Sequence, residues 1–166
     1  MFKEDEKVIN NNGIACVIDR IERMRTPYSK VRRNYYVMHD ICKEDNVYYI
    51  PTDSEGNMRY PITKEEATDL LDSIDDIEQI EIGLERFRDE EYRKCIKESS
   101  PQMLVAMLKY FQKKKKERMS VGKTLPAIDE KYMKLASRNL FSELSCSLSL
   151  PIDEVESIVI EKISES

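Results

Sequence analysis

The sequence predicts an α+β chain, in which a small bent antiparallel β module (residues 1–62) precedes an all-helical domain. Two observations lead to this prediction. Residues 1–62 contain short runs of aromatic and β-branched residues between Asn-, Gly- and Pro-containing turns, a pattern typical of antiparallel strands. From Thr63 onward, apolar residues recur at helical spacing instead. No apolar run approaches the ~20 residues that a membrane-spanning helix requires.

The β module is predicted to consist of four or five short strands. Asn and Gly in the turn at residues 10–13 tolerate the positive φ that tight turns need. Pro51 ends the last strand because it has no amide proton for a β ladder. Such short strands in about sixty residues are typical of a strongly bent sheet or half-barrel. The strands are expected at residues 7–9, 14–24, 34–38 and 47–50, with a hairpin loop at 27–30.

Standard capping signals mark the helical part. Thr63 and Glu66 form a capping box, in which each side chain can bond to the backbone amide of the other residue. Ser100 before Pro101 is a second start signal, with Ser as N-cap and Pro as first helical residue. Residues 63–83 are expected to be a helix followed by an acidic connector at 75–83, the predicted domain boundary. Residues 84–166 are then expected to be helical, with helices near 84–98, from Pro101, from near Asp129 and from Pro151.

Positive charge is concentrated in the middle of the chain. The protein has a net charge of −5, yet residues 99–140 hold ten Lys/Arg against three Asp/Glu. Two interpretations are open: contact with the phosphates of a nucleic acid, or an ordinary solvated surface. Helix-dipole compensation alone does not explain four consecutive lysines, because they repel one another. The candidate DNA-binding residues are Lys113, Lys114, Lys115, Lys116, Arg118, Lys123, Lys131, Lys134 and Arg138.

Residue types with reactive side chains form no recognisable catalytic set, so no enzyme, cofactor, metal site or small-molecule substrate is predicted. The four cysteines are far apart with no CxxC, and we expect reduced thiols in a cytoplasmic protein. His39 is the only histidine and is expected to be a polar residue at a strand edge. The triplet 122–124 resembles the end of a phosphate-binding loop, but Glu117 occupies the position of the first glycine.

Short fragments along nearly the whole chain carry a resemblance to a known family. The N-terminal fragments are 2–3, 7–9, 13–14, 35–38, 50–52, 58–59 and Ile62. The helical fragments are 91–94, 113–118, Ala136 and 140–144. Each fragment alone has little specificity, but in their order and spacing they resemble the CarD/CdnL family of bacterial transcription regulators.

The resemblance implies a Tudor-like N-terminal module that binds the β subunit of RNA polymerase by strand pairing. It also implies a C-terminal helical domain that contacts double-stranded promoter DNA and stabilises the open complex. Phosphate contacts of this kind position a protein on DNA without selecting a sequence. The expected polymerase-binding residues are Tyr35, Tyr36, Val37, Tyr48, Tyr49, Ile50, Pro51 and Arg59.

The chain departs from the family pattern in having no tryptophan. Well-known members place a tryptophan beside the minor groove as a wedge, and residues 84–87 occupy the corresponding region here. Phe87 is one candidate wedge, since apolar side chains can open a base step. The competing interpretation is that Phe87 packs in the helical core.

Two functional hypotheses follow. The first is a monomeric, nucleoid-associated regulator that bridges RNA polymerase and DNA. The second is a polymerase-binding adaptor without DNA binding, which the missing tryptophan and the acidic net charge favour. The salt dependence of DNA affinity distinguishes them, because each neutralised phosphate releases counterions.

Overall fold

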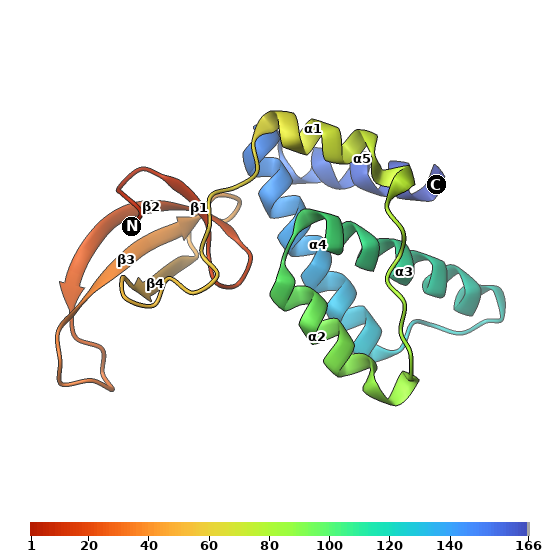
Figure 1. Cartoon of the computed structure of the whole chain (residues 1–166), viewed down its shortest axis with the longest axis horizontal. Helices are drawn as coiled ribbons and strands as arrows, with labels where there is room; N and C mark the ends of the chain where they lie inside the picture. The colour runs from red at the N-terminus through yellow and green to blue at the C-terminus, as the bar shows by residue number, and fades with distance from the viewer. Residues whose placement is uncertain (166) are drawn as a thin grey trace.

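The structure, a computed structural model that describes residues 1–165, has the predicted α+β architecture (Figure 1). Within these residues, a four-stranded antiparallel sheet has the order β1-β2-β3-β4. Its strands are β1 (Lys7–Ile9), β2 (Ala15–Met24), β3 (Arg33–Asp40) and β4 (Val47–Pro51). The helices are α1 (Lys64–Asp72), α2 (Arg88–Glu98), α3 (Pro101–Ser120), α4 (Ala127–Leu148) and α5 (Ile152–Glu165), with 3-10 turns η1 (Ile74–Asp76) and η2 (Glu85–Phe87).

The sheet closes over a small apolar core. Alternating residues of β2 and β3 point inward, among them Ile18, Tyr36 and Met38, and Phe2 packs against them from the N-terminal segment. The register of β2 against β3 shifts between Ile18 and Arg20. Such a bulge bends a strand and increases its twist, which helps four short strands enclose a core.

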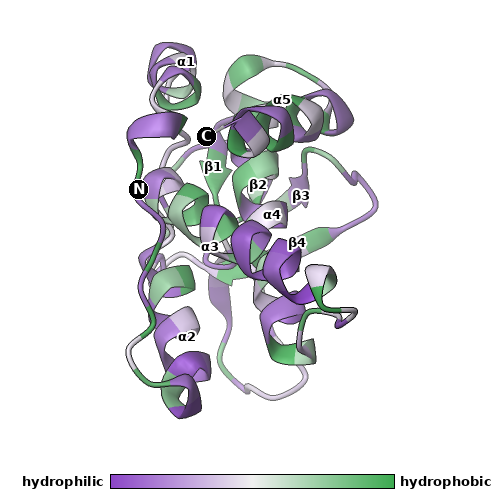
Figure 2. Cartoon of the chain, turned by 90° about the vertical axis from the view of Figure 1, so that its right-hand side faces the viewer, coloured by the Kyte–Doolittle hydropathy of each residue, from purple (hydrophilic) through white to green (hydrophobic). Residues whose placement is uncertain are grey.

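The helices pack around a second and larger core, made mainly by α3 and α4. The capping signals are present as predicted: Thr63 and Glu66 form a capping box, and the Ser100 side chain accepts from the Met103 amide. Figure 2 shows hydrophobic and hydrophilic residues mixed along each helix, as expected of amphipathic helices around one core.

The predicted acidic connector belongs to the helical part of the molecule. Ile77, Ile80 and Ile82 pack against the helical core, and the Ile80 amide donates to the Ala106 carbonyl at 3.3 Å. In Figure 1 this segment crosses α3 on its way from α1 to α2. The segment at 75–83 is therefore packed on the helices, with its acidic residues between the packed isoleucines. The change from sheet to helix comes just before Thr63.

A buried ion pair joins the sheet to the helices. Arg59 follows the sheet, and its two terminal nitrogens lie 2.6 and 2.7 Å from the two carboxylate oxygens of Glu143 on α4. Glu143 is almost fully buried and also accepts from the Ile62 amide at 2.9 Å. Arg59 donates further to the Ser99 carbonyl at 3.1 Å. The two-pronged geometry satisfies a carboxylate that would otherwise be buried without compensation.

The turn between β1 and β2 is a second joint with α4. The Ala15 amide donates to the Ser142 hydroxyl at 2.9 Å. Gly13 has φ +79°, and a Cβ there would lie 2.5 Å from the Asn139 side chain. Both the backbone conformation and the close approach require glycine at this position.

We predict that Glu143→Gln lowers the free energy of unfolding by about 2 kcal/mol, because the Arg59 guanidinium and the Ile62 amide lose the charged acceptor that they share. Chemical denaturation of the full chain measures this loss. Glu130→Gln is the matched control, since it removes a carboxylate from an exposed i,i+4 pair with Lys134 and should cost at most ~0.5 kcal/mol. Equal effects of the two variants would contradict the role given to the buried pair.

Candidate functional site

One edge of the sheet is open. β1 and β4 are the two edge strands, and the backbone of Arg59 covers β1 by exchanging hydrogen bonds of 2.7 and 3.2 Å with Ile9. Across residues 1–165 no strand pairs with the outer edge of β4. An open edge carries unpaired backbone groups that can accept a strand from another protein.

The register identifies the backbone groups that face outward. The Thr52 amide donates to Asn34, and the Asp40 amide donates to Asn46, at the two ends of the β3–β4 pair. Because antiparallel ladders alternate, Tyr48 and Ile50 direct their backbone groups toward β3. The amides and carbonyls of Val47 and Tyr49 therefore point away from the sheet.

The side chains at this edge divide between solvent and core. Val47 is 45% exposed and Tyr49 52% exposed, whereas Tyr48 and Ile50 pack against the module's core. Tyr35, Tyr36 and Val37 are buried, so their side chains support the edge from behind. Pro51 pairs with Tyr35, and its ring leaves no amide at that position.

The expectation that Arg59 lies near these strands is wrong. Arg59 pairs with Ile9 on the opposite edge of the sheet, and its side chain is bound to Glu143. Its position in the sequence, shortly after β4, did not show that the chain crosses to β1 before entering the helices. Arg59 joins the two parts of this chain.

The four lysines at 113–116 do not form one face. Successive residues of an α-helix point about 100° apart, so a run of four surrounds the helix. Lys113 and Lys116 line a hollow of about 310 Å³ beside Ile77 and the end of α5. Lys115 lines a different groove against α4, and Lys114 points inward.

Lys114 neutralises a buried carboxylate. Its Nζ lies 3.1 Å from Asp129, which is fully buried, and 3.6 Å from Glu85. The Tyr92 hydroxyl also donates to Asp129. Burial lowers the pKa of Lys114, but the hydrogen bond and charge of Asp129 outweigh it, and the net shift is upward. Burial and Asp129 together raise the pKa of Tyr92 well above its ordinary value.

Three more of the predicted DNA-binding cations, Arg118, Arg138 and Lys134, have hydrogen-bond or ion-pair partners within the chain. Arg118 donates to the Thr124 carbonyl at 2.6 Å and closes the loop between α3 and α4. Arg138 donates to the Asn12 carbonyl at 3.3 Å, across the joint with the sheet. Lys134 pairs with Glu130, and Lys131 lies over the Tyr132 ring. The expected common basic face therefore shrinks to separate exposed lysines, namely Lys113, Lys115, Lys116, Lys123 and Lys131.

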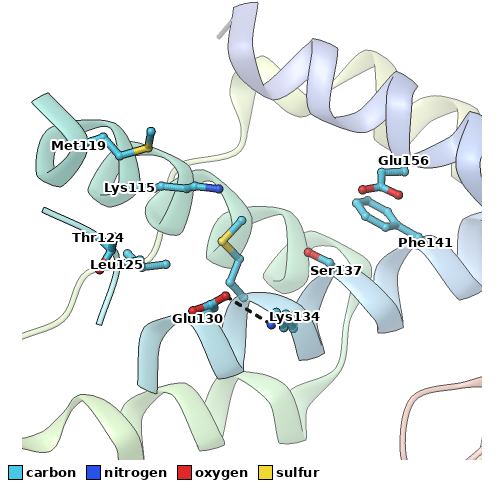
Figure 3. Close-up of a pocket in the computed structure, with 10 residues that line it drawn as sticks. Lys115, Met119, Thr124, Leu125, Glu130, Lys134, Ser137, Phe141 and Glu156 are labelled. Carbon is cyan, nitrogen blue, oxygen red and sulfur yellow. Dashed lines mark ion pairs between the residues drawn. The ribbon is translucent and has the colours of Figure 1, made fainter. Parts of the chain in front are cut away.

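The groove that Lys115 lines has a volume of about 620 Å³ (Figure 3). It lies between the end of α3, the following loop, α4 and α5. Its apolar wall comes from Met119, Leu125, Met133 and Phe141, and the Glu130–Lys134 ion pair of 3.3 Å crosses its rim. This lining suits contact with apolar side chains.

Phe87 is not part of the helical core, which corrects the competing interpretation. It lies at the junction of η2 and α2 with 47% of its surface exposed, and Leu84 beside it is 55% exposed. The Arg86 guanidinium lies 4.8 Å from the centre of the Phe87 ring. This turn therefore presents an apolar ring and a cation to solvent, near Lys114 through its Glu85 contact.

Other features concern the chemistry of single residues. Burial raises the pKa of the Cys16 thiol to about 12, and all four cysteines are free. His39 Nδ1 lies 2.7 Å from an Asp19 oxygen.

In the described part of the chain, residues 1–165, no group of three or more His, Cys, Asp or Glu side chains is placed to hold a metal ion. Nor does any helix there have the length and apolar character needed to cross a membrane.

A second basic segment was missed by the sequence analysis. Residues 20–33, at the hairpin between β2 and β3, contain six Lys/Arg and one Glu. The signal was present, but residues 1–62 are neutral as a whole and the average concealed it. A charge count in windows of about fifteen residues would have identified this segment.

Comparisons with known proteins add no relative. No protein-family model matches the sequence, and no curated protein matches it significantly.

We predict that Lys114→Met and Lys113→Met, neighbouring and chemically identical substitutions, differ sharply in stability. Lys114→Met leaves the buried Asp129 with only the more distant guanidinium of Arg88, 3.8 Å away, and should lower the unfolding free energy by about 2 kcal/mol. Lys113→Met removes an exposed charge and should change it by at most ~0.5 kcal/mol. Denaturant titration of both variants measures the difference. Similar stabilities would show that Lys114 is an ordinary surface lysine.

Proposed function

We propose that this protein is a transcription regulator that binds the β subunit of RNA polymerase along β4 and contacts promoter DNA through its helical part. In this proposal it stabilises the open promoter complex. The observation that carries it is the open β4 edge, with the outward backbone groups of Val47 and Tyr49 beside their exposed side chains. Together with the resemblance to CarD/CdnL proteins, this edge supports docking by strand addition.

The DNA contact has less support than the polymerase contact. Five exposed lysines on and around α3 and α4 can reach phosphates, and Phe87 with Arg86 offers an apolar wedge with a cation beside it. A protein that binds the melted promoter better than the closed one shifts the equilibrium toward melting. Phosphate contacts position a protein on DNA without selecting a sequence. In this proposal, only the wedge at Phe87 would therefore depend on the local structure of the DNA.

The second candidate function is a polymerase-binding adaptor without DNA binding. One observation favours it: Lys114, Arg118, Lys134 and Arg138 interact with partners inside the chain. The cations that remain point in different directions around α3 and α4. Both candidates share the β4 edge, so the first experiment concerns that edge.

We predict that Val47→Pro weakens binding to the N-terminal lobe of the host's RNA polymerase β subunit by about tenfold or more. Proline removes the outward amide of Val47 and places its ring where an added strand must approach. The β3–β4 ladder survives, because this amide is not directed toward β3 and proline is tolerated at the first residue of an edge strand. Calorimetry on the full chain measures the affinity.

Val47→Thr is the control at the same position, because it keeps the amide and the β-branched shape. We expect near wild-type affinity from it. If Val47→Pro also binds like wild type, β4 is not the docking edge. If the wild-type chain does not bind the lobe, the polymerase assignment fails.

We further predict that Phe87→Ala reduces the lifetime of open promoter complexes formed in the presence of this protein by about tenfold, as expected of a lost wedge. Competitor-challenged open complexes on a promoter of the host measure that lifetime. Leu84→Ala removes a similarly exposed apolar side chain three residues earlier, and we expect a smaller effect. Equal lifetimes for wild type and Phe87→Ala would remove Phe87 from the DNA contact.

A further inference from the structure

The hairpin between β2 and β3 is the most concentrated basic surface of the β module. Arg23, Arg25, Lys30, Arg32 and Arg33 are all exposed. Within residues 1–165 none of these five takes part in an ion pair, whereas Arg20 at the base of the hairpin pairs with Glu22 at 2.7 Å. Five cations in eleven residues repel one another, and no salt bridge within residues 1–165 offsets that repulsion. A polyanionic partner would do so.

The hairpin ends in a two-stranded ribbon. β1 pairs with β2 only as far as Val17, and β4 pairs with β3 only from Tyr35 onward. The pairs Arg23–Asn34 and Met24–Arg33 therefore lie beyond β1 and β4, and they are bordered only by the Thr52 amide, which donates to the Asn34 carbonyl. In Figure 1 the ribbon extends beyond the sheet, on the side away from the helices.

The cations lie on both faces of this ribbon. Side chains alternate along a strand, and Arg23 and Arg33 belong to adjacent cross-strand pairs, so they point to opposite faces. Arg25, Lys30 and Arg32 lie beyond them in the loop. An element that enters a groove between two phosphate backbones needs positive charge on both sides.

The tip of the ribbon forms a hydrogen-bonded turn and carries an exposed aromatic ring. The Ser29 amide donates to the Thr26 carbonyl at 3.1 Å, and the Val31 amide donates to the Ser29 hydroxyl at 3.3 Å. These bonds hold a turn in which the Tyr28 side chain is 98% exposed. A tyrosine there can contact base edges in a groove.

We propose that this ribbon, residues 20–33, is a second nucleic-acid contact and inserts into the major groove of B-form DNA. That groove, about 12 Å wide, admits a two-stranded β-ribbon, whereas the major groove of an RNA duplex is too deep and narrow for side chains to read. The charge on both faces favours this partner over an acidic protein surface, which would meet one face. The inference goes beyond the proposed function, which places the DNA contact in the helices.

The test compares two variants of the full chain that each lose three positive charges. The ribbon variant is Arg23→Gln/Arg25→Gln/Arg32→Gln, and the helix variant is Lys113→Gln/Lys116→Gln/Lys123→Gln. Fluorescence anisotropy measures their affinity for a 20-base-pair DNA duplex between 50 and 200 mM salt. Melting temperature and circular dichroism confirm that both variants are folded, and calorimetry measures binding to the polymerase β lobe in parallel.

The proposal predicts that the ribbon variant binds DNA at least tenfold more weakly at low salt. It also predicts that its salt slope of log affinity is shallower by about 2.7, because three phosphate contacts are lost. If the ribbon variant binds DNA with wild-type affinity, the proposal is wrong. If only the helix variant loses DNA affinity, the DNA contact lies in the helices and not in the ribbon. Equal or tighter binding of duplex RNA would exclude insertion into a B-form groove.

Two further outcomes also decide against the ribbon. If the ribbon variant loses polymerase binding but keeps its DNA affinity, the ribbon binds an acidic protein surface and not DNA. If the wild-type chain binds no duplex at 50 mM salt, both DNA contacts fail, while polymerase docking at β4 is judged separately by the Val47→Pro experiment.

Discussion

The buried pair between Arg59 and Glu143 is the contact on which the arrangement of this molecule depends. A carboxylate that is almost fully buried on α4 receives two guanidinium nitrogens and one backbone amide from the chain that leaves the sheet. The same residue covers the β1 edge with its backbone. One arginine therefore closes one edge of the sheet and fixes the sheet on the helices, which leaves β4 as the edge for a partner.

The elements of the fold could be predicted because their signals are local. The capping box at Thr63, the Ser100-Pro101 start and the Asn/Gly turn at 10–13 each act within a few residues, and each is present in the structure. The role of Arg59 could not be predicted, because its partner lies 84 residues later. The segment at 75–83, with three isoleucines between acidic residues, was likewise predicted to be a connector. Its isoleucines pack against α3 and the rest of the helical core, and that packing depends on tertiary contacts that the local sequence does not show.

The candidate sites show the same division between local and distant information. The sequence indicated an aromatic, β-branched edge, and β4 supplies it. It also indicated a basic cluster, but a count of charges does not show in which direction each side chain points from its helix. Lys114 points to Asp129, a buried acid of α4. Only a helical projection together with the position of that acid would have separated it from its neighbours. The basic ribbon was concealed by averaging over a neutral segment.

Strand β3 connects the two proposed surfaces of the β module. Its residues from Tyr35 to His39 pair with β4, and its first residue, Arg33, belongs to the ribbon. A polymerase strand added to β4 and a DNA groove occupied by the ribbon would therefore be held by one continuous strand, with only a few residues between them. At about 3.3 Å per residue, this separation is short and rigid. The spacing between polymerase and DNA would then be set within the sheet, and the helices, fixed by Glu143, would add their contacts at a defined position.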